Sequence, residues 1–187
     1  MIVSSSVLHR FLFTLGATVV RSGTNFLTGL LVARWLGPDE YGRLAFLLGT
    51  FIAVRNLVDV GTSSAFFTFM SQTPRSRRFV ASYFAWLALQ LVGIVALLGA
   101  FLPDEWLAQV WKDEDRMLVV LAWVAVFLQN GAWQAVSQLA ESRRRTVMIQ
   151  SIVAGISLVH LAVACVLWFL ETIGVLSLLL ALLVEHA

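Results

Sequence analysis

Long apolar runs separated by short charged connections dominate the chain. A helix needs about 20 mostly apolar residues to cross a bilayer. Five runs exceed that length and a sixth has 13 residues, so we predict six membrane-spanning helices. The predicted spans are residues 11–35, 41–70, 79–102, 117–139, 147–170 and 172–184. The pattern therefore predicts an all-α, polytopic membrane helix bundle that occupies residues 1–187 as a single transmembrane domain.

The connections between these runs alternate in charge. Basic residues precede the first run and follow the second and fourth, at Arg10, Arg75, Arg77, Arg78, Arg143, Arg144 and Arg145. The other connections are acidic, with Asp39, Glu40, Asp104, Glu105, Asp113, Glu114, Asp115 and Glu171. Because arginine and lysine favour cytoplasmic connections, we predict a cytoplasmic N-terminus and acidic connections on the outside. The alternation at every turn favours six spans over four or five.

Composition agrees with a membrane protein and excludes several other classes. The chain is 59% hydrophobic and 13% charged, whereas soluble domains are about half apolar and a quarter charged. A net charge of +2 gives no support for nucleic-acid binding. The lone Cys165 rules out a disulfide framework and a cysteine-based metal site. Since HExxH, GxSxG, Walker and dinucleotide motifs are also missing, we expect neither enzymatic activity nor a metal or other cofactor.

A short turn joins the first two runs into a predicted helical hairpin. Gly37 can adopt the left-handed conformation that ends a helix, and Pro38 suits the first turn of the next one. Asp39 and Glu40 then lie at the positive end of the second helix dipole. A second short element is predicted at residues 103–111, as a helix on the outer surface. There we expect Asp104 to cap the helix, with the side chains facing lipid being Trp106, Val110 and Trp111.

Polar residues of the first run share one helix face. They recur every three or four residues, at Thr14, Thr18, Arg21, Asn25 and Thr28. A charge at the centre of a bilayer costs about 2.5–3.5 kcal/mol on insertion scales, so this face should contact protein or water. We therefore predict that Arg21 and Asn25 line a cavity, while interhelical hydrogen bonding is the alternative for the threonines and Asn25.

The second run carries an ion pair of its own. Arg55 and Asp59 are four residues apart and can pair along one helix face. Counting along each helix from the shared turn puts Arg21 and Arg55 both about 20 Å below the outer end. We predict a cationic lining for an anionic substrate, in which Asp59 orients an arginine or couples transport. A charge cluster that merely holds two helices together is the alternative.

The fourth and fifth runs add neutral polar groups. Asn130 and Gln134 belong to one hydrogen-bonding face of the fourth run. His160 is a lone histidine in the fifth run, and we favour a packed core residue over the alternative of a ligand or proton relay. Spans one, two, four and five are therefore expected to surround any cavity.

Two stretches resemble a known family. They are residues 33–42, Ala-Arg-Trp-Leu-Gly-Pro-Asp-Glu-Tyr-Gly, and residues 57–65, Leu-Val-Asp-Val-Gly-Thr-Ser-Ser-Ala. Both are similar to the polysaccharide-transporter, or O-antigen-type flippase, branch of the multidrug/oligosaccharidyl-lipid/polysaccharide exporter superfamily. From about residue 75 onward, only the number of spans and the loop charges agree with that family.

The resemblance implies a function, a location and partners. Family members move polyprenyl-pyrophosphate-linked oligosaccharide across the bacterial inner membrane by alternating access between two lobes of six or seven helices. By that resemblance the pyrophosphate would bind Arg21 and Arg55. Our own assignment of helix faces gives the sugar hydroxyls to Asn25, Asn130 and Gln134. Expected partners are membrane lipids, the lipid-linked glycan, a missing C-terminal lobe or a second copy, and glycan polymerase or export machinery.

The chain supplies at most half of the family's twelve to fourteen spans. We therefore expect it to be the N-terminal lobe of a flippase. Three alternatives stay open: a cation-coupled small-molecule exporter of the same superfamily, a non-transporting scaffold of a polysaccharide-synthesis complex, and an integral-membrane transferase. The last would need a catalytic loop that the sequence does not offer.

Overall fold

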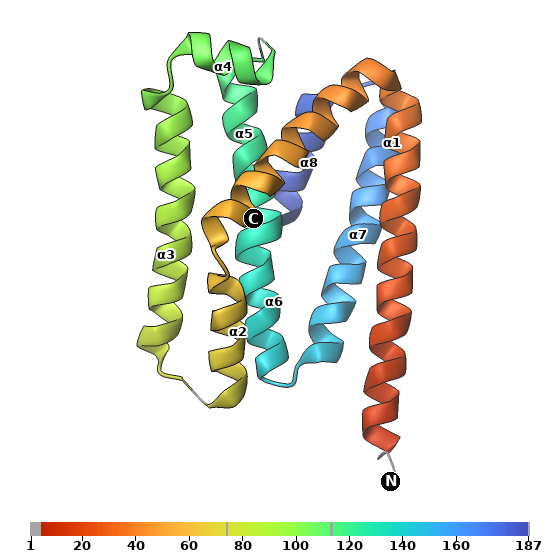
Figure 1. The fold of residues 1–187 in the computed structure, drawn as a ribbon. Coiled ribbons are helices and arrows are strands. Elements are labelled where there is room, and N and C mark those ends of the chain that lie inside the picture. The colour runs from red at the N-terminus through yellow and green to blue at the C-terminus, as the bar shows by residue number, and fades with distance from the viewer. Residues whose placement is uncertain (1–4, 74, 113, 187) are drawn as a thin grey trace.

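The computed structural model describes residues 5–73, 75–112 and 114–186; Asp113, one of the predicted outer acidic residues, lies outside these ranges. The described residues form helices and contain no strand, which confirms the predicted all-α membrane helix bundle (Figure 1). In chain order the elements are α1 (Ser5–Asp59), α2 (Thr62–Gln72), α3 (Arg77–Ala96), η1 (Leu97–Phe101), α4 (Asp104–Trp111), α5 (Arg116–Phe127), η2 (Leu128–Ala132), α6 (Trp133–Ser142), α7 (Thr146–Phe169) and α8 (Val175–His186). The two η elements are π-helical turns: η1 extends α3, and η2 joins α5 to α6.

Within the described residues, four helical stretches are long and apolar enough to cross a membrane. They are Phe11–Asp59, Arg77–Phe101, Arg116–Ser142 and Thr146–Phe169, and the first of them is bent at Gly37. Helix α8 is apolar but shorter. These lengths and compositions are those of a multi-pass membrane protein.

The bend in α1 matches the predicted turn. Gly37 has φ 76° and ψ 173°, a conformation open to glycine and strained for other residues, and Pro38 lies in the helix that follows. Beside the bend, the ring of Trp35 stacks on Trp168 at the end of α7, with centroids 5.2 Å apart. Residues 5–36 run beside α7, whereas residues 38–59 descend obliquely across the bundle toward α2 (Figure 1). The two arms of the predicted hairpin therefore diverge from the Gly37 bend and do not pack side by side along their length.

The predicted second span, residues 41–70, is interrupted one turn after Arg55. Val60 (φ 46°) and Gly61 (φ 77°) take left-handed conformations that end α1, and α2 starts at Thr62. The Asp59 carboxylate accepts hydrogen bonds from the hydroxyls of Thr62 (3.0 Å) and Ser63 (2.7 Å). Asp59 therefore fastens the start of α2 to the end of α1 in the manner of a helix cap.

The connections collect at two ends of the bundle. The Gly37 bend, α4 and the end of α7 lie at one end, while the N-terminal end of α1 and the α2–α3 and α6–α7 connections lie at the other (Figure 1). We call the second end the basic end, because it carries the arginines at positions 75, 77, 78, 143, 144 and 145. The acidic and basic connections thus lie at opposite ends.

Helix α4 lies against the core on one side, which corrects part of the expectation for residues 103–111. Trp106 and Val110 are exposed, but Trp111 is only 7% exposed and stacks on Phe51 with centroids 5.6 Å apart. The prediction that Trp111 faces lipid was wrong, because Phe51 offers it an apolar partner inside the bundle. The Asp104 side chain makes no cap and instead pairs with Arg116.

Replacing Gly37 by alanine should destabilise the bend. The Cβ would have free space around it, but the φ of 76° with ψ of 173° strains any side-chain-bearing residue by about 1–3 kcal/mol. We expect a lower midpoint of thermal unfolding in detergent. Gly42→Ala is the matched control, since Gly42 is helical with open space around it, and alanine is the better helix former there. Equal midpoints for the two variants would contradict the strained bend.

Candidate functional site

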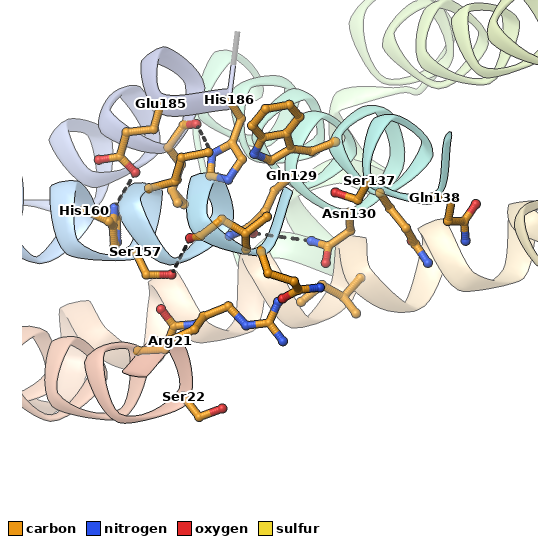
Figure 2. A pocket seen from close by; sticks show the side chains of 18 of the residues that line it. Arg21, Ser22, Gln129, Asn130, Ser137, Gln138, Ser157, His160, Glu185 and His186 are labelled. Carbon is orange, nitrogen blue, oxygen red and sulfur yellow. Dashed lines mark hydrogen bonds and ion pairs between the residues drawn. The ribbon is translucent and has the colours of Figure 1, made fainter. Parts of the chain in front are cut away.

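A polar cavity of about 800 Å³ opens between α1, the η2–α6 segment, α7 and α8 (Figure 2). Its lining comprises Arg21, Ser22, Asn25, Ile52, Gln129, Asn130, Trp133, Gln134, Ser137, Gln138, Glu141, Gln150, Val153, Ile156, Ser157, His160, Leu182, Glu185 and His186. Figure 2 shows Arg21 and Ser22 on one side of it and Glu185 and His186 on the other. Its volume is in the range of small-molecule pockets, although its lining is more polar than usual.

Four of the six predicted site residues line this cavity. Arg21 and Asn25 come from one face of α1, where their i,i+4 spacing brings both to the same side. Asn130 and Gln134 have the same spacing across the junction of η2 with α6. The structure thus brings two predicted polar faces, more than 100 residues apart in sequence, to one cavity.

Arg55 and Asp59 do not line the cavity. The Arg55 side chain is 3% exposed and its guanidinium donates to Asp59 at 3.1 Å. It also lies over the Phe127 ring, 5.7 Å from the centroid. The oblique course of residues 38–59 explains this position, because it carries Arg55 inward against α5 and η2 instead of alongside Arg21. These contacts fit the second interpretation of the pair, a charge cluster that holds helices together.

Gly131 allows the Arg55 side chain to lie close to the backbone of η2. A Cβ at Gly131 would lie 3.1 Å from Arg55 Nε, a distance too short for ordinary packing. Gly131 belongs to the π-helical turn η2, and such turns inside helices are frequent at functional sites. The same turn carries Gln129 and Asn130 to the cavity wall.

Sequence reasoning missed a contact between two side chains of the cavity wall. His160 Nδ1 on α7 lies 2.8 Å from Glu185 Oε2 on α8, and Oε1 of the same carboxylate is buried without a hydrogen-bond partner among the described residues. The interpretation of His160 as a packed core residue foresaw neither this carboxylate partner nor its place in the cavity lining. The only available signal was a histidine on one apolar helix and a glutamate at the end of another, 25 residues apart.

The cavity wall is rich in amides and only weakly charged. Six amide side chains line it: Asn25, Gln129, Asn130, Gln134, Gln138 and Gln150. Of the described lining residues, Arg21 is the only arginine or lysine, whereas two, Glu141 and Glu185, are carboxylates. Glu141 accepts a hydrogen bond from Gln150 at 3.0 Å. The predicted cationic lining is thus reduced to one arginine, which shares an amide-rich wall with two carboxylates.

This arrangement can bind a polar ligand by hydrogen bonds. Asn25 and Gln134 are exposed, and their amides form no hydrogen bond within the described residues. Each amide offers donors and an acceptor, which suits hydroxyl-rich ligands that need both. The described residues contain no group of histidine, cysteine and acidic side chains that could hold a metal ion.

The fold and cavity define a multi-pass α-helical membrane protein with a polar cavity inside its helix bundle. A family model described as "Polysaccharide biosynthesis protein" matches residues 7–186, so the chain belongs to that family. The match confirms the resemblance seen at residues 33–42 and 57–65. No curated protein and no solved structure matches the chain.

Proposed function

We propose that this chain forms one lobe of a flippase that moves a polyprenyl-pyrophosphate-linked glycan across the bacterial inner membrane by alternating access. The observation that supports this most is the amide-rich wall of the 800 Å³ cavity, whose one arginine forms no ion pair within the described residues. Amides match sugar hydroxyls, and an arginine matches a pyrophosphate. Such a protein needs no covalent chemistry. A second lobe or a second copy of the chain would close the open side of the cavity.

The proposed orientation places the basic end in the cytoplasm. The arginine-bearing α2–α3 and α6–α7 connections lie at that end together with the N-terminal end of α1 (Figure 1). Arginine-rich connections are retained on the cytoplasmic side in most membrane proteins. The glycan would then enter from the basic end and leave beside the Gly37 bend.

Translocation can be measured with the protein expressed from its complete reading frame and reconstituted in proteoliposomes. A fluorescent oligosaccharide on polyprenyl pyrophosphate is placed in both leaflets, and a membrane-impermeant quencher reports its exchange between them. We expect the quenched fraction to rise beyond the outer-leaflet share only in liposomes that contain the protein. If the substrate stays in its leaflet while the protein is inserted and folded, the flippase proposal is wrong.

The amide wall makes a specific prediction. Changing Asn130 and Gln134 together to leucine keeps similar volumes but removes two amides, and net hydrogen bonds contribute about 0.5–1.5 kcal/mol each. We expect glycan binding to weaken by roughly fivefold or more. Gln109→Leu is the matched control, because Gln109 is exposed on α4 away from the cavity. Unchanged affinity in the double variant would show that these two amides do not contribute to glycan binding.

One observation favours a second candidate, a cation-coupled small-molecule exporter. The buried Glu185 carboxylate has one oxygen near His160 and the other without a hydrogen-bond partner among the described residues, and acidic and histidine side chains inside membrane-spanning bundles mark ion and proton pathways. The same proteoliposomes distinguish the candidates. Efflux of an organic cation driven by a proton gradient, without glycan exchange, would support the exporter and reject the flippase.

A further inference from the structure

A second, smaller pocket of about 330 Å³ lies at the basic end of the bundle, between the end of α2 and the α6–α7 connection. Three arginines line it, Arg75, Arg143 and Arg144, together with hydroxyls of Ser71, Thr73 and Ser142. The two pockets have no lining residue in common, although Glu141 of the large cavity and Ser142 of the small one are neighbours in the sequence. The small pocket is thus distinct from the amide-rich cavity.

The charge of this pocket is not compensated. None of the described residues that line it is acidic, and no ion pair within the described chain involves any of its three arginines. Three positive charges around so small a volume repel one another. Solvent screens part of this repulsion because all three side chains are exposed, and an anion in the space between them would reduce it further.

Arg75 is held in place by aromatic rings. Its guanidinium lies 5.3 Å from the ring centroid of Phe69 and 5.8 Å from that of Phe79. Arg75 Nε donates to the carbonyl of Phe69 at 3.3 Å. These contacts fix the plane of the guanidinium and leave its two terminal nitrogens free to donate, as recognition of an oxyanion requires.

Helix dipoles account for only part of this cluster. Arg143 and Arg144 follow the C-terminus of α6, where the negative end of the dipole favours cations. Arg75, in contrast, precedes α3, and Arg77 and Arg78 occupy its first turn. That is the positive end of a dipole, where cations are disfavoured and anions are stabilised. A topology signal explains why arginines lie at this end, but not why they converge on one pocket.

From these observations we propose that the pocket binds a phosphate group. Guanidinium groups form charge-assisted, often bidentate hydrogen bonds to phosphate oxygens, and the hydroxyls of Ser71 and Thr73 can complete the set, whereas that of Ser142 donates to the carbonyl of Leu139. The pocket lies at the ends of membrane-spanning helices, where anionic lipid headgroups are abundant. The phosphodiester of such a headgroup and a free phosphate ion are the two sources of this ligand. The site is independent of the flippase function proposed for the large cavity.

Titrations of the thermal unfolding midpoint test the site, because a ligand that binds only the folded protein raises the midpoint. The probes for the full-length protein in uncharged detergent are short-chain phosphatidylglycerol, inorganic phosphate, and a diacylglycerol of the same chain length without phosphate. We expect stabilisation by one or both phosphate probes and none by diacylglycerol. Stabilisation by phosphatidylglycerol alone identifies a lipid headgroup, and stabilisation by inorganic phosphate identifies a free ion. If neither phosphate probe acts, the proposal is overturned.

Variants locate the site. Changing both Arg143 and Arg144 to glutamine should weaken the apparent affinity roughly tenfold or more, because each charge-assisted hydrogen bond contributes about 1.5–3 kcal/mol. Arg145→Gln is the matched control, since this neighbouring arginine does not line the pocket. Arg75→Lys keeps the charge but loses the planar fork, so the rise in the unfolding midpoint that phosphate produces should be smaller than in the unchanged protein. Equal losses of apparent affinity in the Arg145 control and the double variant would show that binding depends on diffuse surface charge, and would overturn the proposed site.

Discussion

Replacing Asp59 by alanine is expected to lower the free energy of unfolding by about 3–5 kcal/mol, because removing one partner of a buried pair leaves an uncompensated charge. Arg55 is 3% exposed, and its only ion-pair partner in the described chain is Asp59 at 3.1 Å. Arg55 Nε already has no hydrogen-bond partner, so the loss of Asp59 would leave the guanidinium almost unpaired. Thermal and denaturant unfolding in detergent measure the change.

The same substitution removes the hydrogen bonds that Asp59 accepts from the hydroxyls of Thr62 and Ser63. Asp59→Asn separates the two effects, because asparagine is also a good cap but carries no charge. The control is the double variant Arg55→Met, Asp59→Leu, which removes both charges and should recover most of the stability. If that variant folds stably but no longer binds glycan, the pair belongs to the binding site and its purely structural role is wrong.

The sequence predicted the elements whose signals are local. Apolar runs located the long helices, and the Gly37-Pro38 step located the bend with its left-handed glycine. Helix periodicity also grouped Arg21 with Asn25, and Asn130 with Gln134, on faces that reach the same cavity. Each of these features depends on residues within one or two helical turns, where spacing alone determines the geometry.

Features that depend on how helices cross could not be predicted in the same way. Counting along two helices assumed a tight, parallel-sided hairpin, but α1 is splayed and Arg55 packs beside Gly131 instead of beside Arg21. The π-helical turn at residues 128–132, which includes Gly131, has no hydrophobic periodicity of its own. The His160–Glu185 pair joins two helices that only tertiary packing brings together.

Replacing Arg21 by glutamine is expected to weaken binding of a polyprenyl-pyrophosphate glycan by roughly 10- to 100-fold, because charge-assisted hydrogen bonds contribute about 1.5–3 kcal/mol and each 1.4 kcal/mol is tenfold in Kd. Arg21 forms no ion pair with the described carboxylates, and Glu185, the acidic side chain on the opposite wall, is paired with His160. Its charge is therefore available to an anionic ligand. Titration of the purified protein with the lipid-linked glycan measures the effect.

The comparison of two ligands separates charge recognition from general damage to the cavity. Arg21→Gln should lose affinity for the pyrophosphate-linked glycan while its affinity for the same oligosaccharide without pyrophosphate changes little, because the amides that we propose to bind the sugar remain. The affinity of Arg21→Lys for the pyrophosphate-linked glycan should lie between that of the unchanged protein and that of Arg21→Gln, since lysine keeps the charge but loses bidentate hydrogen bonding. Arg34→Gln, exposed near the Gly37 bend and outside the cavity lining, is the matched control. Equal losses for both ligands in Arg21→Gln would mean that this arginine supports the wall of the cavity and does not contact the pyrophosphate.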